Sequence, residues 1–166
     1  MQGLYIHIPF CISKCAYCDF ASFANIKRLR LPYLKALKRE LLLQKKHYKN
    51  FAPKTLYIGG GTPSFLTAAQ IKFLFESVYS CYKNFKEITF EANPESLTLA
   101  KIKLLKNLGV TRLSLGLQSA NNEHLKTLGR AHNYAIFLRA YTQAKKYFSK
   151  LPDLMYIGIL ETEEKK

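Results

Sequence analysis

Short hydrophobic segments alternate with longer amphipathic segments along the 166 residues of this chain. The short segments are rich in β-branched and large apolar residues, as strands are. In one of the longer segments, apolar residues follow Ile71 at offsets of three, four, seven and eleven, which is the period of a helix with one apolar stripe. This alternation predicts repeated β-α units on a parallel sheet. The predicted strands cover residues 4–8, 55–59, 87–91 and 112–117, and a fifth begins near residues 153–157.

Local signals place the predicted helices between these strands. Thr67, followed three residues later by Gln70, forms a capping box at the start of the second helix. The third helix covers about residues 98–108 and stops at Gly109, a residue type favoured just after helix C-termini. The fourth lies between residues 133 and 148. The residues expected on the buried side of the first helix are Leu34, Leu37 and Leu41.

The pattern is that of an α/β protein with about four β-α units and the start of a fifth strand. A closed barrel of eight such units typically needs ~250 residues, so the sheet is open or the chain is incomplete. An incomplete sheet would leave a strand edge unpaired and favour self-association. We expect one continuous domain over residues 1–157 and a charged, disordered tail over residues 158–166.

Charge and composition narrow the class of protein. The formal net charge is +15, and residues 27–54 hold ten Lys or Arg and one Glu. Such a cluster attracts nucleic acid, acidic lipid or anionic substrates, although a solvated lysine-rich helix face is the simpler interpretation. No apolar stretch reaches the ~20 residues that a membrane span requires, and the N-terminus has no secretory signal pattern. We therefore expect a cytoplasmic protein whose thiols stay reduced.

Three of the four cysteines are grouped directly after the first predicted strand. Cys11, Cys15 and Cys18 have the spacing CxxxCxxC, whereas Cys81 ends the second predicted helix, at the opposite end of the strands. Three thiolates can hold three irons of a cubane cluster and leave the fourth iron open for another molecule. The alternatives are a zinc site that includes His7 as a fourth ligand, and thiols that bind no metal.

Glycine and polar residues follow the other predicted strands at the same end. The second strand continues into Gly59, Gly60 and Gly61. A glycine run lets a ligand contact the backbone, because no Cβ stands in the way, and it also suits a tight turn. Glu91 ends the third strand and Gln118 follows the fourth. Ligands bind at the carboxyl ends of the strands in α/β sheets and barrels, so these residues together predict a binding site.

Five segments carry a more specific pattern. They are LYIHIPFC at residues 4–11, KCAYCDF at 14–20, GGGTPS at 59–64, EANPE at 91–95 and RLSLGLQS at 112–119. Together they resemble the radical S-adenosylmethionine (radical SAM) proteins related to oxygen-independent coproporphyrinogen III oxidase. The resemblance covers residues 3–156 and implies the first part of a partial TIM-like barrel, with the family's later barrel units and C-terminal domain absent.

The resemblance implies two cofactors and the residues that hold them. Cys11, Cys15 and Cys18 would bind a 4Fe-4S cluster whose open iron is chelated by the amine and carboxylate of S-adenosylmethionine. The family chemistry is one-electron reduction of the sulfonium, which gives methionine and a 5'-deoxyadenosyl radical that abstracts hydrogen. Arg130 suits the carboxylate, and Gln118 suits a ribose hydroxyl. The positions that match contacts of this cofactor are Tyr5, Tyr17, Gly60, Gly61, Thr62, Glu91, Gln118, Arg130 and Asp153.

The resemblance also implies a role in heme or porphyrin metabolism. Asp19 and Phe20 follow the third cysteine as in the heme chaperone branch, whereas the oxidases have a Cys-Gly-Cys pattern there. The expected function is that of a heme chaperone, and coproporphyrinogen oxidation is the alternative. The expected partners are heme or a porphyrin and an electron donor such as flavodoxin or ferredoxin. A zinc-stabilised nucleic-acid-binding module would explain the charge alone, and we do not expect nucleic acid.

The chaperone branch has a heme-binding motif, His-Asn-x-x-Tyr-Trp, in the part of the family that this chain lacks. The chain contains no Trp, and His132-Asn133 matches only the first two positions of the motif. For His132 a helix-cap or surface role is expected, as it is for His47 and His124.

Overall fold

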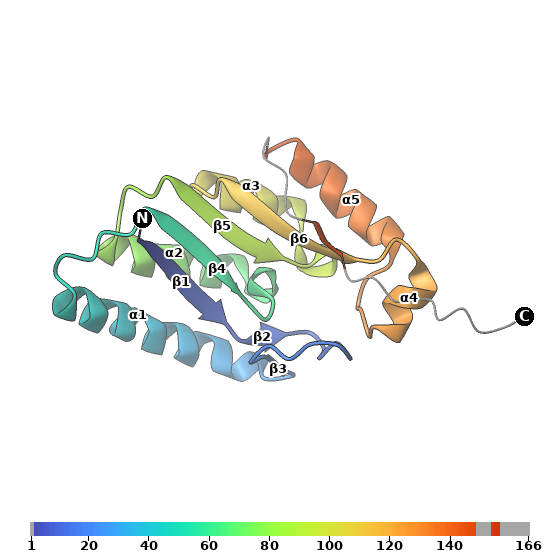
Figure 1. Cartoon of the computed structure of the whole chain (residues 1–166), viewed down its shortest axis with the longest axis horizontal. Coiled ribbons are helices and arrows are strands. Elements are labelled where there is room, and N and C mark those ends of the chain that lie inside the picture. The colour runs from blue at the N-terminus through green and yellow to red at the C-terminus, as the bar shows by residue number, and fades with distance from the viewer. Residues whose placement is uncertain (1, 149–153, 157–166) are drawn as a thin grey trace, which may run out of the picture.

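The computed structural model describes residues 2–148 and 154–156. Its main feature is a five-stranded parallel sheet in the order β1-β4-β5-β6-β7. The carboxyl ends of the strands therefore all lie at one end of the sheet (Figure 1). The predicted α/β class and the order of the strands along the chain are confirmed. The strands are β1 (Gly3–Ile8), β4 (Thr55–Gly60), β5 (Glu87–Ala92), β6 (Arg112–Gln118) and β7 (Leu154–Tyr156).

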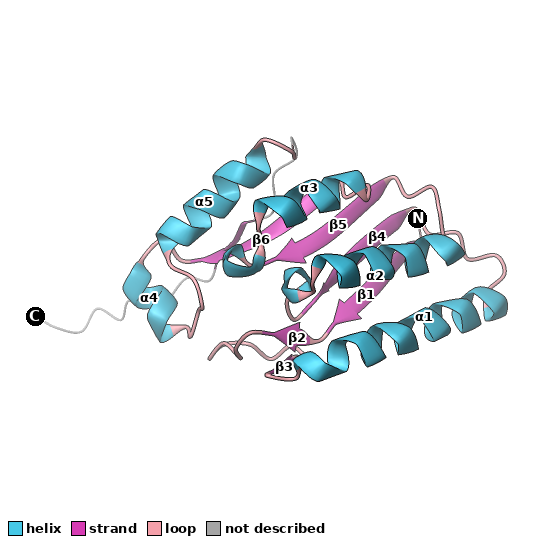
Figure 2. Cartoon of the chain, turned by 180° about the vertical axis from the view of Figure 1, so that it is seen from behind, coloured by secondary structure: helices cyan, strands magenta, loops and turns pink. Residues whose placement is uncertain are grey.

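Four helices cover one face of the sheet, as the views from the two sides show (Figures 1 and 2). The opposite face has no helix on it among the described residues. Each helix returns the chain from the carboxyl end of one strand to the start of the next, as a parallel order requires. The covering helices are α1 (Arg30–His47), α2 (Ala68–Cys81), α3 (Leu99–Asn107) and α5 (Tyr134–Lys145).

The helices begin and end where the sequence signals lie. At the start of α2, the Gln70 amide donates to Thr67 Oγ1 over 3.2 Å and the Thr67 amide donates to Gln70 Oε1 over 3.0 Å, so the predicted capping box is confirmed. Gly109 follows α3 with a φ of 86°, a conformation that glycine adopts without strain. Leu34 and Leu41 of α1 are 1% and 5% exposed, and both belong to the core.

The two faces of the sheet differ in chemistry because side chains alternate along each strand. Ile6 and Ile58 point toward the helices and are fully or almost fully buried. Their neighbours Tyr5 and Tyr57 point to the face without helices, where they are 53% and 37% exposed. The register pairs Tyr5 with Tyr57, so aromatic and polar side chains line this second face side by side.

Several short elements were not predicted. Most of them lie at the carboxyl ends of the strands, where they frame the site described below (Figure 1). Each is too short to show a hydrophobic period. They are the strand pair β2 (Phe10–Cys11) and β3 (Phe23–Ala24), the helix α4 (Asn122–Thr127), and the 3-10 turns η1 (Lys27–Leu29), η2 (Pro63–Phe65) and η3 (Pro94–Ser96).

Two predictions lie outside the described residues: the charged tail over residues 158–166, and the contact assigned to Asp153. Within the described part of the chain, no helix combines the length and the hydrophobicity that crossing a lipid bilayer requires.

Candidate functional site

A cavity of about 790 Å³ lies at the carboxyl ends of the strands. All three cysteines of the loop after β1 line it, so the structure brings together the thiols and the strand-end residues that the sequence predicted. All four cysteines are free and partly exposed, and α2 ends in Cys81 at the opposite end of the sheet. The residues of the predicted cofactor set that line the cavity are Tyr17, Gly60, Gly61, Thr62, Glu91, Gln118 and Arg130.

Tyr5 does not line this cavity. It lies in the middle of β1, and its hydroxyl group is 3.1 Å from Nδ1 of His7. Tyr5 is instead among the residues that border a second cavity of about 510 Å³ beside β1. Its ring lies 5.8 Å from that of Tyr57, which holds Glu91, so the cofactor contact assigned to Tyr5 stays a prediction.

His7 is not directed at the cysteines. Its Nε2 atom lies 2.7 Å from the carbonyl oxygen of Ala21, and its Nδ1 atom faces Tyr5. Among the described residues, no three His, Cys, Asp or Glu side chains are arranged to hold one metal ion. A four-ligand zinc site therefore has no support from this geometry, whereas the cysteines of a cubane cluster bind separate irons and need not converge on one point.

The glycine run packs directly against the start of the cysteine loop. The Gly61 amide donates to the Ile8 carbonyl over 2.9 Å, and a Cβ on Gly61 would lie only 3.0 Å from Sγ of Cys11. Gly60 has a φ of 110°, and a Cβ there would lie 2.7 Å from the His7 ring. Thr62 donates through Oγ1 to Cys11 Sγ over 3.5 Å. Glycine is required here because two backbone segments approach each other closely.

Glu91 is held in place by two groups of β4. The Tyr57 hydroxyl donates to its Oε1 atom over 2.6 Å, and the Gly60 amide donates to its Oε2 atom over 3.1 Å. Burial and the hydrogen bond to this carboxylate both raise the pKa of Tyr57, so the phenol stays protonated as the donor. The carboxylate of Glu91 is therefore fixed at the edge of the cavity.

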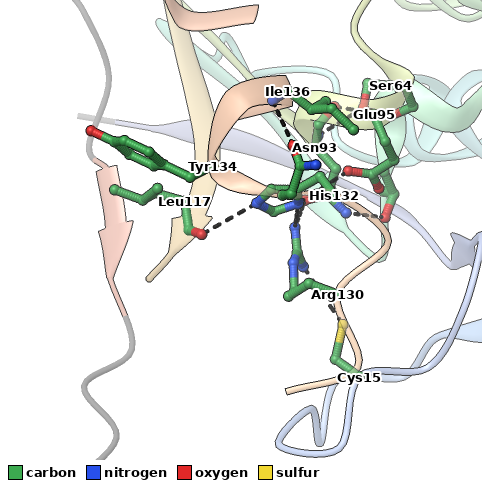
Figure 3. A network of polar contacts seen from close by, with 12 residues as sticks. Cys15, Ser64, Asn93, Glu95, Leu117, Arg130, His132, Tyr134 and Ile136 are labelled. Carbon is green, nitrogen blue, oxygen red and sulfur yellow. Dashed lines mark hydrogen bonds and ion pairs between the residues drawn. The ribbon is translucent and has the colours of Figure 1, made fainter. Parts of the chain in front are cut away.

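Arg130 links the cysteine loop to the end of β5 (Figure 3). Its Nη2 atom donates to Oδ1 of Asn93 over 2.8 Å, while Nη1 contacts Sγ of Cys15 at 3.6 Å and the hydroxyl of Tyr17 at 3.4 Å. Burial raises the pKa of Tyr17 to about 12, although the charge of Arg130 opposes this rise. The guanidinium therefore lies beside a thiol that could act as a metal ligand.

Three buried polar atoms of the cavity residues have no hydrogen-bond partner among the described residues. They are Nε of Arg130, Oε1 of Gln118 and Oε2 of Glu95, the last of which lies 3.3 Å from Nδ1 of His132. Gln118 is also in the left-handed region, with a φ of 66°, which is uncommon for a residue other than glycine. Buried polar groups are nearly always paired, so these atoms indicate a ligand with a donor and an acceptor of its own.

Three residues next to Arg130 were not predicted from the sequence, namely Asn93, Glu95 and His132. The prediction that His132 lies at a cap or on the surface is wrong, since the residue is 4% exposed and its Nδ1 atom lies 3.3 Å from Oε2 of Glu95. The cap of α5 is Asn133, whose side chain accepts from the Ile136 amide over 2.9 Å. The EANPE segment contains both Asn93 and Glu95, but neither was assigned a role there.

The other histidines lie nearer to their predicted places. His47 ends α1 and is exposed, as predicted. His124 is half-buried in α4, where its Nδ1 atom lies 3.5 Å from the hydroxyl of Ser119.

A family model and the sequences of known proteins both match most of this chain. Residues 5–166 match the family model described as the radical SAM superfamily. The heme chaperone HemW of Bacillus subtilis is 36% identical over 149 residues, which cover 88% of this chain and 39% of that protein. HemW of Escherichia coli is 39% identical over 135 residues, which cover 78% of this chain and 35% of that protein. The chain therefore spans well under half the length of these relatives.

The solved structure of a protein with a different name shows the same fold. The chain superposes on coproporphyrinogen III oxidase (HemN) from Escherichia coli, described as a radical SAM enzyme, with a TM-score of 0.85 and 26% identity. The superposition covers 93% of this chain and 36% of the oxidase chain. The parallel sheet with helices on one face is thus the architecture of a radical SAM enzyme.

Proposed function

The chain belongs to the radical SAM superfamily, and from that premise we propose that it forms the cofactor-binding part of a heme chaperone that holds a 4Fe-4S cluster and S-adenosylmethionine. One observation carries the proposal. The cavity that all three cysteines of the loop line is also lined by residues with buried, unpartnered polar atoms, among them Arg130 and Gln118. These residues fit a cluster and a zwitterionic, hydroxyl-bearing ligand side by side.

Cys11, Cys15 and Cys18 are the proposed ligands of the cluster. Thr62 and Arg130 already donate to the sulfurs of Cys11 and Cys15, and such hydrogen bonds stabilise the thiolate charge that a ligand must carry. When bound, the cluster supplies the electron for reductive cleavage of S-adenosylmethionine.

The remaining residues of the cavity are proposed to hold S-adenosylmethionine. Arg130 has a free Nε donor for the carboxylate, and Gln118 has a free Oε1 acceptor for a ribose hydroxyl. Glu91 is fixed by β4 at the cavity edge, where it can accept a hydrogen bond from the same ligand. Asp153 is a further proposed contact on the basis of the resemblance. The other proposed contacts are Tyr17, Gly60, Gly61 and Thr62.

A heme chaperone is favoured over an oxidase because the curated relatives at 36–39% identity carry that name. The pair Asp19 and Phe20 after the third cysteine supports the same choice. Heme and a reducing partner such as flavodoxin or ferredoxin are the proposed partners. Reduced thiols favour a cytoplasmic location. We place the radical SAM core at residues 1–157 and the charged tail at residues 158–166.

Cluster content tests this proposal directly. After anaerobic reconstitution and desalting, the chain should retain about four irons and four sulfides per molecule, as a cubane requires. Cys15→Ser should lose most of this content because it removes a ligand. Cys81→Ser is the matched control and should retain all of it. Equal loss in both variants, or zinc in place of iron in the protein as purified without oxygen, would contradict the proposal.

A further inference from the structure

A buried histidine and a carboxylate lie directly behind the guanidinium of Arg130 (Figure 3). The side chain of His132 is 0% exposed and that of Glu95 is 12% exposed. Nδ1 of His132 lies 3.3 Å from Oε2 of Glu95 and 3.4 Å from Nη2 of Arg130. The three groups belong to η3 and to the segment between α4 and α5, so residues distant in sequence meet at this point.

Each ring nitrogen of this histidine faces an oxygen that accepts hydrogen bonds. Nε2 lies 3.3 Å from the carbonyl oxygen of Leu117, and Nδ1 lies 3.3 Å from Oε2 of Glu95. Nδ1 is the atom that faces both charged neighbours. It can accept from Arg130 when the ring is neutral and donate to Glu95 when the ring is protonated.

Glu95 supplies a negative charge that balances the positive charge of the Arg130 guanidinium. Burial by itself would raise the pKa of Glu95, but its contact with His132 and the charge of Arg130 outweigh burial and lower the pKa below the ordinary value of 4.5. The carboxyl group is therefore ionised at neutral pH. The half-buried guanidinium of Arg130 is stabilised by such a counter-charge, because an unpaired charge away from water is unfavourable.

The remaining contacts of Arg130 point the other way, toward the cavity. Nη2 is anchored on Asn93, and Nη1 faces Cys15 and Tyr17. An arginine side chain has several rotatable bonds, and these contacts on one side do not fix its position alone. His132 contacts the guanidinium without lining the cavity, and Glu95 contacts His132 and also lines the cavity.

We propose that His132 and Glu95 are positioning residues that hold Arg130 in the orientation that binds the carboxylate of S-adenosylmethionine and contacts the sulfur of Cys15. This inference rests on the proposed function and adds two residues to its site. His132 does not line the cavity, and Glu95, which does, is assigned no direct contact with the cofactor. Both act through the guanidinium of Arg130.

A double-mutant cycle tests this indirect action. The dissociation constant of S-adenosylmethionine is measured by equilibrium dialysis on the reconstituted chain and on three variants: His132→Ala, Arg130→Ala and the double variant. We expect His132→Ala to weaken binding about tenfold, the usual scale for residues that orient a ligand group. In the Arg130→Ala background the same change should have no further effect, because coupled residues are not additive.

Further variants separate positioning from a general structural role. His132→Asn keeps a polar atom near the place of Nδ1 and should recover part of the affinity. His47→Ala, at the exposed end of α1, is the matched control and should bind as the unaltered chain does. If His132→Ala fails to fold or to retain iron, Glu95→Gln carries the same cycle with a nearly isosteric change.

The outcomes distinguish this inference from the proposed function. An unaltered chain that binds no cluster or no S-adenosylmethionine overturns the proposed function. If the unaltered chain binds both, a His132→Ala variant with unchanged affinity overturns the inference alone. Losses that add fully in the double variant also overturn it, because His132 would then act independently of Arg130.

Discussion

The hydroxyl group of Tyr57 in β4 donates a hydrogen bond of 2.6 Å to Oε1 of Glu91 in β5. The Gly60 amide binds the other carboxylate oxygen, so neighbouring strands hold both oxygens of one side chain. Glycine at position 59 makes room for this arrangement, because a Cβ there would lie 2.9 Å from Oε2 of Glu91. The glycine run therefore shapes the sheet face as well as the turn that follows it.

Removal of this hydroxyl group should lower stability modestly. Tyr57→Phe loses a hydrogen bond to a charged acceptor, and the partial exposure of the ring keeps the expected loss in the free energy of unfolding at about 1 kcal/mol. Urea denaturation monitored by circular dichroism measures it. Tyr48→Phe is the control, because the Tyr48 hydroxyl makes no hydrogen bond among the described residues. An equal loss in both variants would show that the contact with Glu91 contributes nothing.

Gly60 should not tolerate a side chain. Gly60→Ala combines a φ of 110° with a Cβ placed 2.7 Å from the His7 ring, and we expect it to lower the free energy of unfolding by about 2 kcal/mol or more. Gly129→Ala is the matched control, since Gly129 also has a positive φ, of 70°, but a Cβ there would make only ordinary van der Waals contacts, the nearest at 3.8 Å. Near-native stability of Gly60→Ala, measured by the same denaturation, would mean that the two loops are not packed as described.

The contribution of Glu95 to stability should depend on pH. Its pKa is lower in the folded chain than the ordinary 4.5, despite burial, because of His132 and Arg130. The folded state therefore favours the ionised form, and the stabilisation is present above about pH 4.5 and lost as the pH falls through the folded pKa. The free energy of unfolding of the apo chain should exceed that of Glu95→Gln at pH 7, and the difference should shrink toward pH 3. A difference that grows on acidification would reverse the sign assigned here.

The strands and helices could be predicted from the sequence because their signals are local. Apolar runs predicted the strands β1, β4, β5 and β6 to within one residue at each end. The capping box at Thr67 and the stop at Gly109 placed the ends of helices. The parallel order then predicted which loops meet, and so the position of the cavity at the strand ends.

The surroundings of Arg130 could not be predicted in the same way. His132 is followed by Asn133 at the start of a helix, a local context that suggested a cap, whereas its burial depends on contacts with Glu95 and Leu117 from other parts of the chain. Tyr5 was assigned a cofactor contact from the family resemblance and not from its local context. The register of β1 places it beside Tyr57, on the sheet face that also carries Glu91, but it does not line the cavity, so its cofactor contact stays a prediction.

The response of a reduced cluster to S-adenosylmethionine tests the central claim most directly. Electron paramagnetic resonance spectra of the reconstituted, dithionite-reduced chain are recorded with and without saturating S-adenosylmethionine. The account predicts a changed spectrum, and a response weakened roughly ten- to a hundredfold in apparent affinity in Arg130→Ala, which loses a charge-assisted hydrogen bond. An intact cluster whose spectrum stays the same at saturating S-adenosylmethionine would contradict the assignment of this cavity as the cofactor site.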